Sequence, residues 1–244
     1  MTIVLFDIDG TLVRTGGAGV RAMSRAFEDL FGVAGAFDGI PMAGRTDKGI
    51  IEDAAARAGV EAGMPLFESF RRKYCERLLE ALPELGYRRC VLPGVLPLLD
   101  ALAPRSDVFV ALLTGNCEQG ARLKLEHFDL WRFFPCGAFG DDVRNRNELF
   151  AVAMQRAREH GAPEVAREDV IVVGDTELDV ACAAAGGARS VAVATGPANS
   201  AALRQCGADV VFEDLSDTEA FLRLLLNTQK AKRPIVGRSG RRGR

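Results

Sequence analysis

The chain has 244 residues, of which 48% are hydrophobic and 26% are charged, and its formal net charge at pH 7 is −2. This length allows one α/β domain together with a smaller domain, and these proportions are typical of a soluble globular protein. No apolar run approaches the roughly 20 residues that a membrane helix needs, and the N-terminus (MTIVLFDIDG) reaches acidic residues too early for a signal peptide. We therefore expect a cytoplasmic protein with no membrane partner.

Short apolar runs typical of buried strands recur at residues 3–6, 108–113, 170–173, 190–194 and 209–212. Helical patterns follow at 117–128, 147–160, 178–185, 198–205 and 217–227. This alternation predicts βαβ units, and strands that are apolar throughout indicate a sheet with helices on both faces. We therefore predict an α/β fold with a doubly wound parallel sheet, formed by residues 1–14 and 91–229.

Residues 15–90 interrupt this alternation. They show helical patterns near 19–31, 47–59 and 65–82 and no convincing strand, so we predict a smaller inserted helical domain. Its linkers to the sheet domain are expected near residues 12–17 and 85–93, where they would form a hinge.

The C-terminal residues 230–244 contain seven Lys or Arg and no acid, which leaves 24 basic against 33 acidic residues before them. Such a Gly- and Arg-rich end buries too little apolar surface to offset its ordering entropy, so we predict a basic disordered tail. Weak contact with nucleic acid is expected only through this tail. The six cysteines form no C-x-x-C pair, and with only two histidines in the chain we predict reduced thiols and neither a zinc site nor a disulfide framework.

Three of the predicted strands are followed directly by short segments rich in polar residues. They contain Asp7 and Asp9, then Thr114, Gly115 and Asn116, and finally Asp175 with Asp179. Ligands bind at the carboxyl ends of parallel strands, and an all-oxygen cluster of carboxylates suits Mg²⁺. A single Asp at a strand end is more often a helix cap or turn residue, but the complete set favours a metal site.

The same residues form recognisable motifs. Residues 7–11 (DIDGT), 112–115 (LLTG) and 174–179 (GDTELD) resemble the first, second and fourth motifs of the haloacid dehalogenase superfamily. The resemblance extends over residues 3–227 and is greatest to phosphoglycolate-phosphatase-like hydrolases. It implies a Rossmann-like core and identifies the helical insert, residues 15–90, as the cap domain of that family.

This resemblance implies that Asp7 is the nucleophile that forms an aspartyl phosphate and that Asp9 is the general acid and base. Thr114, with Gly115 and Asn116 beside it, would hold phosphate oxygens. It further implies an Mg²⁺ ion held by Asp7, Asp175 and the carbonyl of Asp9, with Asp179 in a supporting role.

The third motif departs from the family pattern, because residues 142–147 (DVRNRN) contain no Lys-Pro pair. We expect Lys124 to supply the missing cation, and Arg146 is the alternative. In the insert, Arg45 is a candidate ligand for a substrate carboxylate or phosphate, and its alternative is a surface Arg beside a capping Thr or Asp.

We therefore expect a magnesium-dependent phosphoric monoester hydrolase that acts on a small phosphorylated metabolite. A phosphomutase or a pyrophosphatase on the same scaffold is the nearest alternative, and a non-catalytic binding protein that contacts nucleic acid through its tail is another. A dehalogenase is disfavoured because the second aspartate of the first motif, Asp9, is present.

Overall fold

The chain's largest feature is a six-stranded sheet with the order β5-β4-β1-β6-β7-β8, in which every neighbouring pair is parallel. A computed structural model describes residues 1–83 and 89–230. The strands are β1 (Thr2–Phe6), β4 (Val108–Leu113), β5 (Gly137–Ala138), β6 (Val170–Gly174), β7 (Arg189–Val193) and β8 (Val210–Phe212). The predicted doubly wound α/β fold is confirmed. Only β5 was not predicted, since two residues are too few to produce a composition signal.

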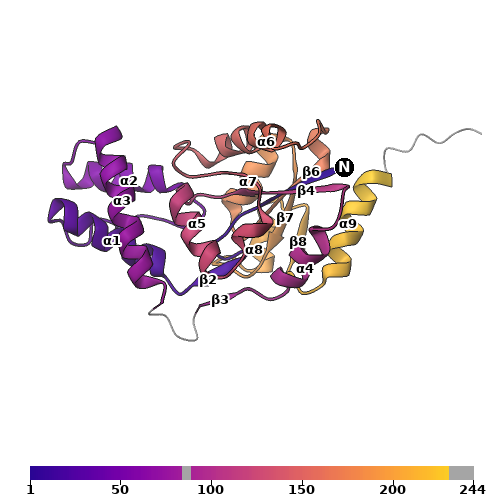
Figure 1. Cartoon of the computed structure of the whole chain (residues 1–244), viewed down its shortest axis with the longest axis horizontal. Helices are drawn as coiled ribbons and strands as arrows, with labels where there is room; N and C mark the ends of the chain where they lie inside the picture. Colours follow the sequence, from indigo (N-terminus) through magenta and orange to yellow (C-terminus); the bar gives the residue numbers. More distant parts are fainter. Residues whose placement is uncertain (84–88, 231–244) are drawn as a thin grey trace, which may run out of the picture.

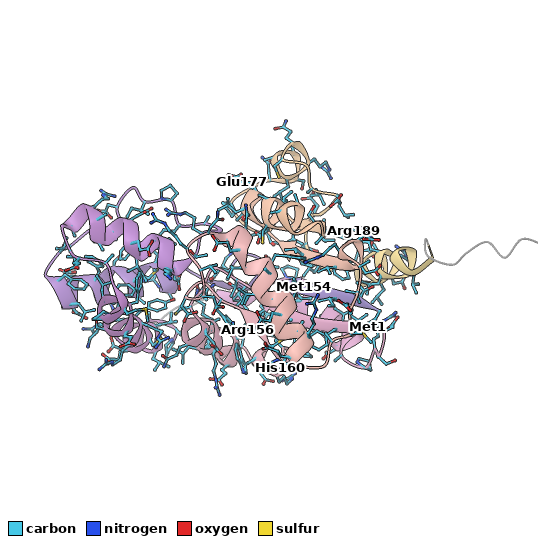
Figure 2. All side chains as sticks on the ribbon, turned by 90° about the horizontal axis from the view of Figure 1, so that it is seen from above. Met1, Met154, Arg156, His160, Glu177 and Arg189 are labelled. Atoms are coloured by element: carbon cyan, nitrogen blue, oxygen red, sulfur yellow. The ribbon has the colours of Figure 1, made fainter. Side chains whose placement is uncertain are left out.

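Helices cover both faces of this sheet. They are α4 (Val95–Leu102), α5 (Glu118–His127), α6 (Leu149–Glu159), α7 (Glu177–Gly186), α8 (Ser200–Gln205) and α9 (Thr218–Lys230). Successive side chains of β1 alternate between the faces, so that Ile3 packs in the cluster with α6 and α7 while Val4 packs in the cluster with α4 and α9. Figure 2 shows α6, with Met154 and Arg156 labelled, lying across the sheet.

Helix α4 was not predicted from the sequence, although it contains Pro97 and follows Gly94. Pro97 lies in the first helical turn, where its missing N–H would have no partner within the helix. Gly94 precedes the helix in the left-handed conformation. Both residues therefore begin the helix rather than interrupt it.

Three helices lie near the ranges 19–31, 47–59 and 65–82 that the sequence predicted as helical: α1 (Ala18–Phe31), α2 (Asp47–Ala58) and α3 (Met64–Ala81). We call residues 18–81, which contain these helices and the segments between them, the helical unit. They enclose a hydrophobic cluster that includes Phe27, Phe70, Tyr74 and Leu78. Figure 1 shows the helical unit at one end of the molecule and α9 at the other. In the part of the chain that is described, no helix has the length and apolarity needed to span a membrane.

The connections between the helical unit and the sheet differ from the prediction. Two strands, β2 (Val13–Thr15) and β3 (Arg89–Val91), pair in an antiparallel ribbon. The expectation of no strand in residues 15–90 is therefore wrong at its two ends. Neither three-residue strand has a periodic pattern of its own, and each exists because it pairs with the other. Residues 85–88 of the second linker, and the predicted tail apart from residue 230, lie outside the described residues.

Candidate active site

The turn that follows β1 places two aspartates at the carboxyl end of the sheet. Asp7 remains beside β6, because its N–H donates to the carbonyl of Val173 at 2.9 Å. Gly10 then adopts a φ of +81°, and a Cβ at this position would overlap the Asp175 carboxylate. Only glycine fits here, and the turn lets Asp7 and Asp9 line one cavity of about 400 Å³ between the sheet and the helical unit.

Three buried carboxylates gather at and behind the floor of this cavity, and of these Asp7 and Asp175 line it. Oxygen atoms of Asp7, Asp175 and Asp179 all lie within 4.8 Å of one another. Burial raises the pKa of Asp175 to about 9, and the charges of Asp7 and Asp179 add to the effect. Burial also raises the pKa of Asp7 to about 6, against the opposing influence of Arg146 and with the support of Asp179 and Asp9. This floor therefore has a deficit of positive charge.

Arg146 is the cation of this floor. It begins the 3₁₀ turn Arg146–Glu148 ahead of α6, and its Nη2 lies 2.5 Å from Asp179 Oδ1 and 3.1 Å from Asp7 Oδ1. Its Nη1 donates to the carbonyl of Gly44 in the helical unit at 2.9 Å. Nε is buried and has no hydrogen-bond partner among the residues that the structure describes. The guanidinium thus connects the predicted nucleophile with the helical unit.

Lys124 forms an ion pair with Asp9, the second aspartate of the turn after β1. It lies in α5 and is buried, with Nζ 2.5 Å from Asp9 Oδ2 and 2.5 Å from Asn116 Oδ1. Asn116 Nδ2 in turn donates to Asp9 Oδ2 at 2.9 Å. The sequence offered Lys124 and Arg146 as alternatives for one position, whereas the structure brings both into the site on different aspartates.

The end of β4 supplies the next part of the site. Thr114 is fully buried, and its Oγ1 accepts a hydrogen bond from Asn116 Nδ2 at 2.9 Å. Gly115 and Asn116 line the cavity, while Thr114 is not among the described lining residues. Thr114 therefore orients Asn116 from behind.

Asp179 has two separate contacts. Its Oδ2 accepts hydrogen bonds from the N–H and hydroxyl of Thr176, the N-cap residue of α7, at 3.0 and 2.6 Å. Its Oδ1 faces Arg146. A helix cap and an ion pair together fix this carboxylate, which in turn orients Arg146.

The turn before α2 brings the helical unit onto the sheet domain. The N–H of Asp47 donates to the carbonyl of Gly115 at 2.7 Å, and the Thr46 hydroxyl donates to the carbonyl of Arg144 at 2.6 Å. Arg45 lines the cavity, but its guanidinium pairs with Asp53 at 2.6 Å, within the helical unit. Its charge is therefore already balanced.

Two cavity residues were not predicted from the sequence. Asp47 is buried, and its Oδ2 accepts a hydrogen bond from the N–H of Cys117 at 2.8 Å. Tyr74 in α3 is 2% exposed and also lines the cavity. The sequence suggested Asp47 only as a helix-capping residue beside Arg45, and Tyr74 resembled any apolar position on a helix.

Comparison with known proteins places this geometry in context. The family model described as haloacid dehalogenase-like hydrolase matches residues 4–193. The chain is 26% identical over 231 residues to a phosphoglycolate phosphatase of Shigella boydii, an alignment that covers 88% of this chain and 89% of that protein. Among solved structures, a hydrolase from Pseudomonas syringae has a TM-score of 0.64 at 23% identity, covering 92% of this chain and 99% of that one. CbbY from Rhodobacter sphaeroides in complex with phosphate has a TM-score of 0.64 at 21% identity, with coverages of 89% and 96%.

Proposed function

Because the chain belongs to the haloacid dehalogenase-like hydrolases, we propose that it is a magnesium-dependent phosphatase that hydrolyses a small phosphorylated metabolite through an aspartyl phosphate on Asp7. Membership confirms the family that the motifs predicted, and with the curated relatives it supports an enzyme of the phosphatase type. The observation that carries the proposal is the convergence of Asp7, Asp9 and Asp175 on one cavity.

The floor of the cavity fits a hard divalent cation. Its donors are all oxygen atoms, and the raised pKa of Asp175 means that Arg146 alone does not balance three buried carboxylates. Asp7, Asp175 and the carbonyl of Asp9 would hold Mg²⁺, with Asp179 behind them. When bound, the ion supplies positive charge that stabilises the transferring phosphoryl group.

The residues of the chain then perform the transfer in two steps. A carboxylate oxygen of Asp7 forms a bond to phosphorus as the bond to the ester oxygen breaks, and Asp9 gives its proton to that departing oxygen. In the second step Asp9 takes a proton from water, whose oxygen attacks phosphorus and releases Asp7. Lys124 and Asn116 hold Asp9 in place for both steps. Arg146 stabilises Asp7 as a carboxylate.

We assign the helical unit the role of a cap domain, residues 15–90, on a catalytic core of residues 1–14 and 91–229. The hydrogen bonds of Thr46 and Asp47 to the sheet domain hold it over the cavity. A cap in this position excludes bulk water before transfer and contributes the surface that contacts the leaving group.

Phosphate release tests this function. Purified protein with Mg²⁺ should release phosphate from members of a broad panel of phosphate monoesters, and EDTA should abolish release. Asp7→Asn should lose at least about 10⁴-fold in kcat, because it removes the nucleophile. Asp38→Asn, an exposed acid of the helical unit, is the matched control and should retain activity. Full activity in Asp7→Asn would reject the nucleophile, and isomerised phosphoester without free phosphate would favour a mutase.

A further inference from the structure

The end of the cavity beside α5 contains a hydroxyl with no protein partner. Tyr74 is a buried residue that lines the cavity, and its hydroxyl forms no hydrogen bond with any residue that the structure describes. A Cβ placed on Gly19 would lie 3.6 Å from Tyr74 Oη and 3.2 Å from Lys124 Nζ, so both polar atoms face the same small region. The hydroxyl is accessible from the cavity, so a bound molecule with a hydrogen-bonding group can pair with it.

The charges around this region disfavour an anion. Lys124 is its cation and is shared between two carboxylates, Asp9 at 2.5 Å and the nearby Asp47. Burial raises the pKa of Asp47 to about 6 against the opposing influence of Lys124, which leaves Asp47 largely ionised at pH 7 to 8. Because Asp9 carries a proton in the first step, the Asp47 carboxylate alone balances the Lys124 ammonium group, and a negative charge on the leaving group would find no unpaired cation in this region.

Of the three other cations that line the cavity, two pair with carboxylates and the third, Arg14, does not among the described residues. Arg45 pairs with Asp53 and Arg146 pairs with Asp7. Arg14 is exposed at the rim and donates to a backbone carbonyl at 2.7 Å. No buried cation in the described part of the cavity is free to receive a carboxylate of the leaving group.

We propose that the substrate is a phosphate monoester whose leaving group carries a hydroxyl and no negative charge, and that the Tyr74 hydroxyl binds this group. The proposal rests on the phosphatase function above and names its substrate class. Val20, Met23 and Ile50 line the same cavity and provide apolar contact for the carbon atoms of the leaving group. The expected substrate thus differs from phosphoglycolate, the compound in the name of the curated relatives, which carries a carboxylate.

A pair of esters of matched size tests the charge preference. In 2-hydroxyethyl phosphate a hydroxymethyl group replaces the carboxylate of 2-phosphoglycolate. We expect kcat/KM with Mg²⁺ to be at least about tenfold higher for the hydroxylated ester. A preference for 2-phosphoglycolate would overturn the inference and leave the phosphatase function intact. No release from either ester or from p-nitrophenyl phosphate would instead reject the phosphatase function, and this inference with it.

Two variants test the residues. Tyr74→Phe should lower the kcat/KM ratio of 2-hydroxyethyl phosphate to ethyl phosphate about fivefold to tenfold, because the lost hydrogen bond serves only the hydroxylated ester. Asp47→Asn should raise kcat/KM for 2-phosphoglycolate relative to 2-hydroxyethyl phosphate several-fold, because one repelling charge is gone. Asp38→Asn should leave both ratios unchanged. The unfolding temperature of Tyr74→Phe shows whether this variant is folded. If it equals that of the wild type, and neither Tyr74→Phe nor Asp47→Asn changes its kcat/KM ratio, the inference is wrong.

Discussion

The buried carboxylate of Asp175 should make the protein less stable without metal, so its replacement by the neutral isostere Asn should stabilise the fold while removing activity. Burial and the charges of Asp7 and Asp179 raise its pKa from 3.8 to about 9. The folded state therefore holds a proton that the unfolded chain releases at much lower pH. The sign follows from this difference: the contribution of Asp175 to stability is fully present below about pH 4 and is lost progressively as the pH rises toward 9.

The size of the effect can be worked out from the same values. Between the two pKa values, the free energy of unfolding falls by about 1.4 kcal/mol for each unit of pH. At pH 7 the destabilisation caused by Asp175 is therefore at most about 4 kcal/mol. Part of the raised pKa belongs to the coupled pair of Asp7 and Asp175, so the full bound is not expected. We expect Asp175→Asn to raise the free energy of unfolding by about 2 to 4 kcal/mol in EDTA at pH 7. The gain should shrink toward zero near pH 4.

Urea unfolding followed by circular dichroism, in EDTA from pH 4 to pH 8, measures this gain. Mg²⁺ should stabilise the wild type and leave Asp175→Asn nearly unchanged, because the variant lacks a ligand. A variant no more stable than the wild type at pH 7, or a gain independent of pH, would refute the electrostatic reasoning. Equal stabilisation of both proteins by Mg²⁺ would refute the assignment of Asp175 as a metal ligand.

Two further predictions concern the turn after β1 and the cation of the floor. Gly10→Ala should lower the free energy of unfolding by about 1 to 3 kcal/mol and abolish stabilisation by Mg²⁺, because its Cβ displaces the Asp175 carboxylate. The control is Gly32→Ala, at a φ of +67° with open space around it. In the same thermal unfolding assay this control should lose about 1 kcal/mol and keep its response to Mg²⁺. Arg146→Lys keeps the charge but cannot reach Asp7, Asp179 and the helical unit together, so kcat/KM for phosphate release should fall by about 10-fold to 100-fold; an unchanged value would mean that a point charge is sufficient.

The sheet and the meeting of Asp7, Asp9 and Asp175 could be predicted because both follow from local patterns. A buried parallel strand is an apolar run, and the carboxyl ends of neighbouring strands share one edge. The β2–β3 ribbon could not be predicted in this way, since each strand depends on a partner that lies far away in the sequence.

The remaining details of the site depend on which charges meet in space. Arg45 lies in a turn where an arginine is a reasonable candidate to bind substrate. In the structure, however, Asp53, two helical turns along α2, balances its charge. Tyr74 occupies an apolar position on α3, and only the packing of α3 against α5 shows that its hydroxyl reaches the cavity. Neither outcome is encoded in a motif.

Arg146 shows why the missing Lys-Pro pair of the third motif does not weaken the site. An ammonium group presents one point charge, whereas the guanidinium of Arg146 presents a planar fork whose two ends face in different directions. One end contacts both Asp7 and Asp179, and the other donates to Gly44 in the turn of the helical unit that also contains Thr46 and Asp47. The electrostatic environment of Asp7 is therefore coupled to the docking of the helical unit through a single side chain.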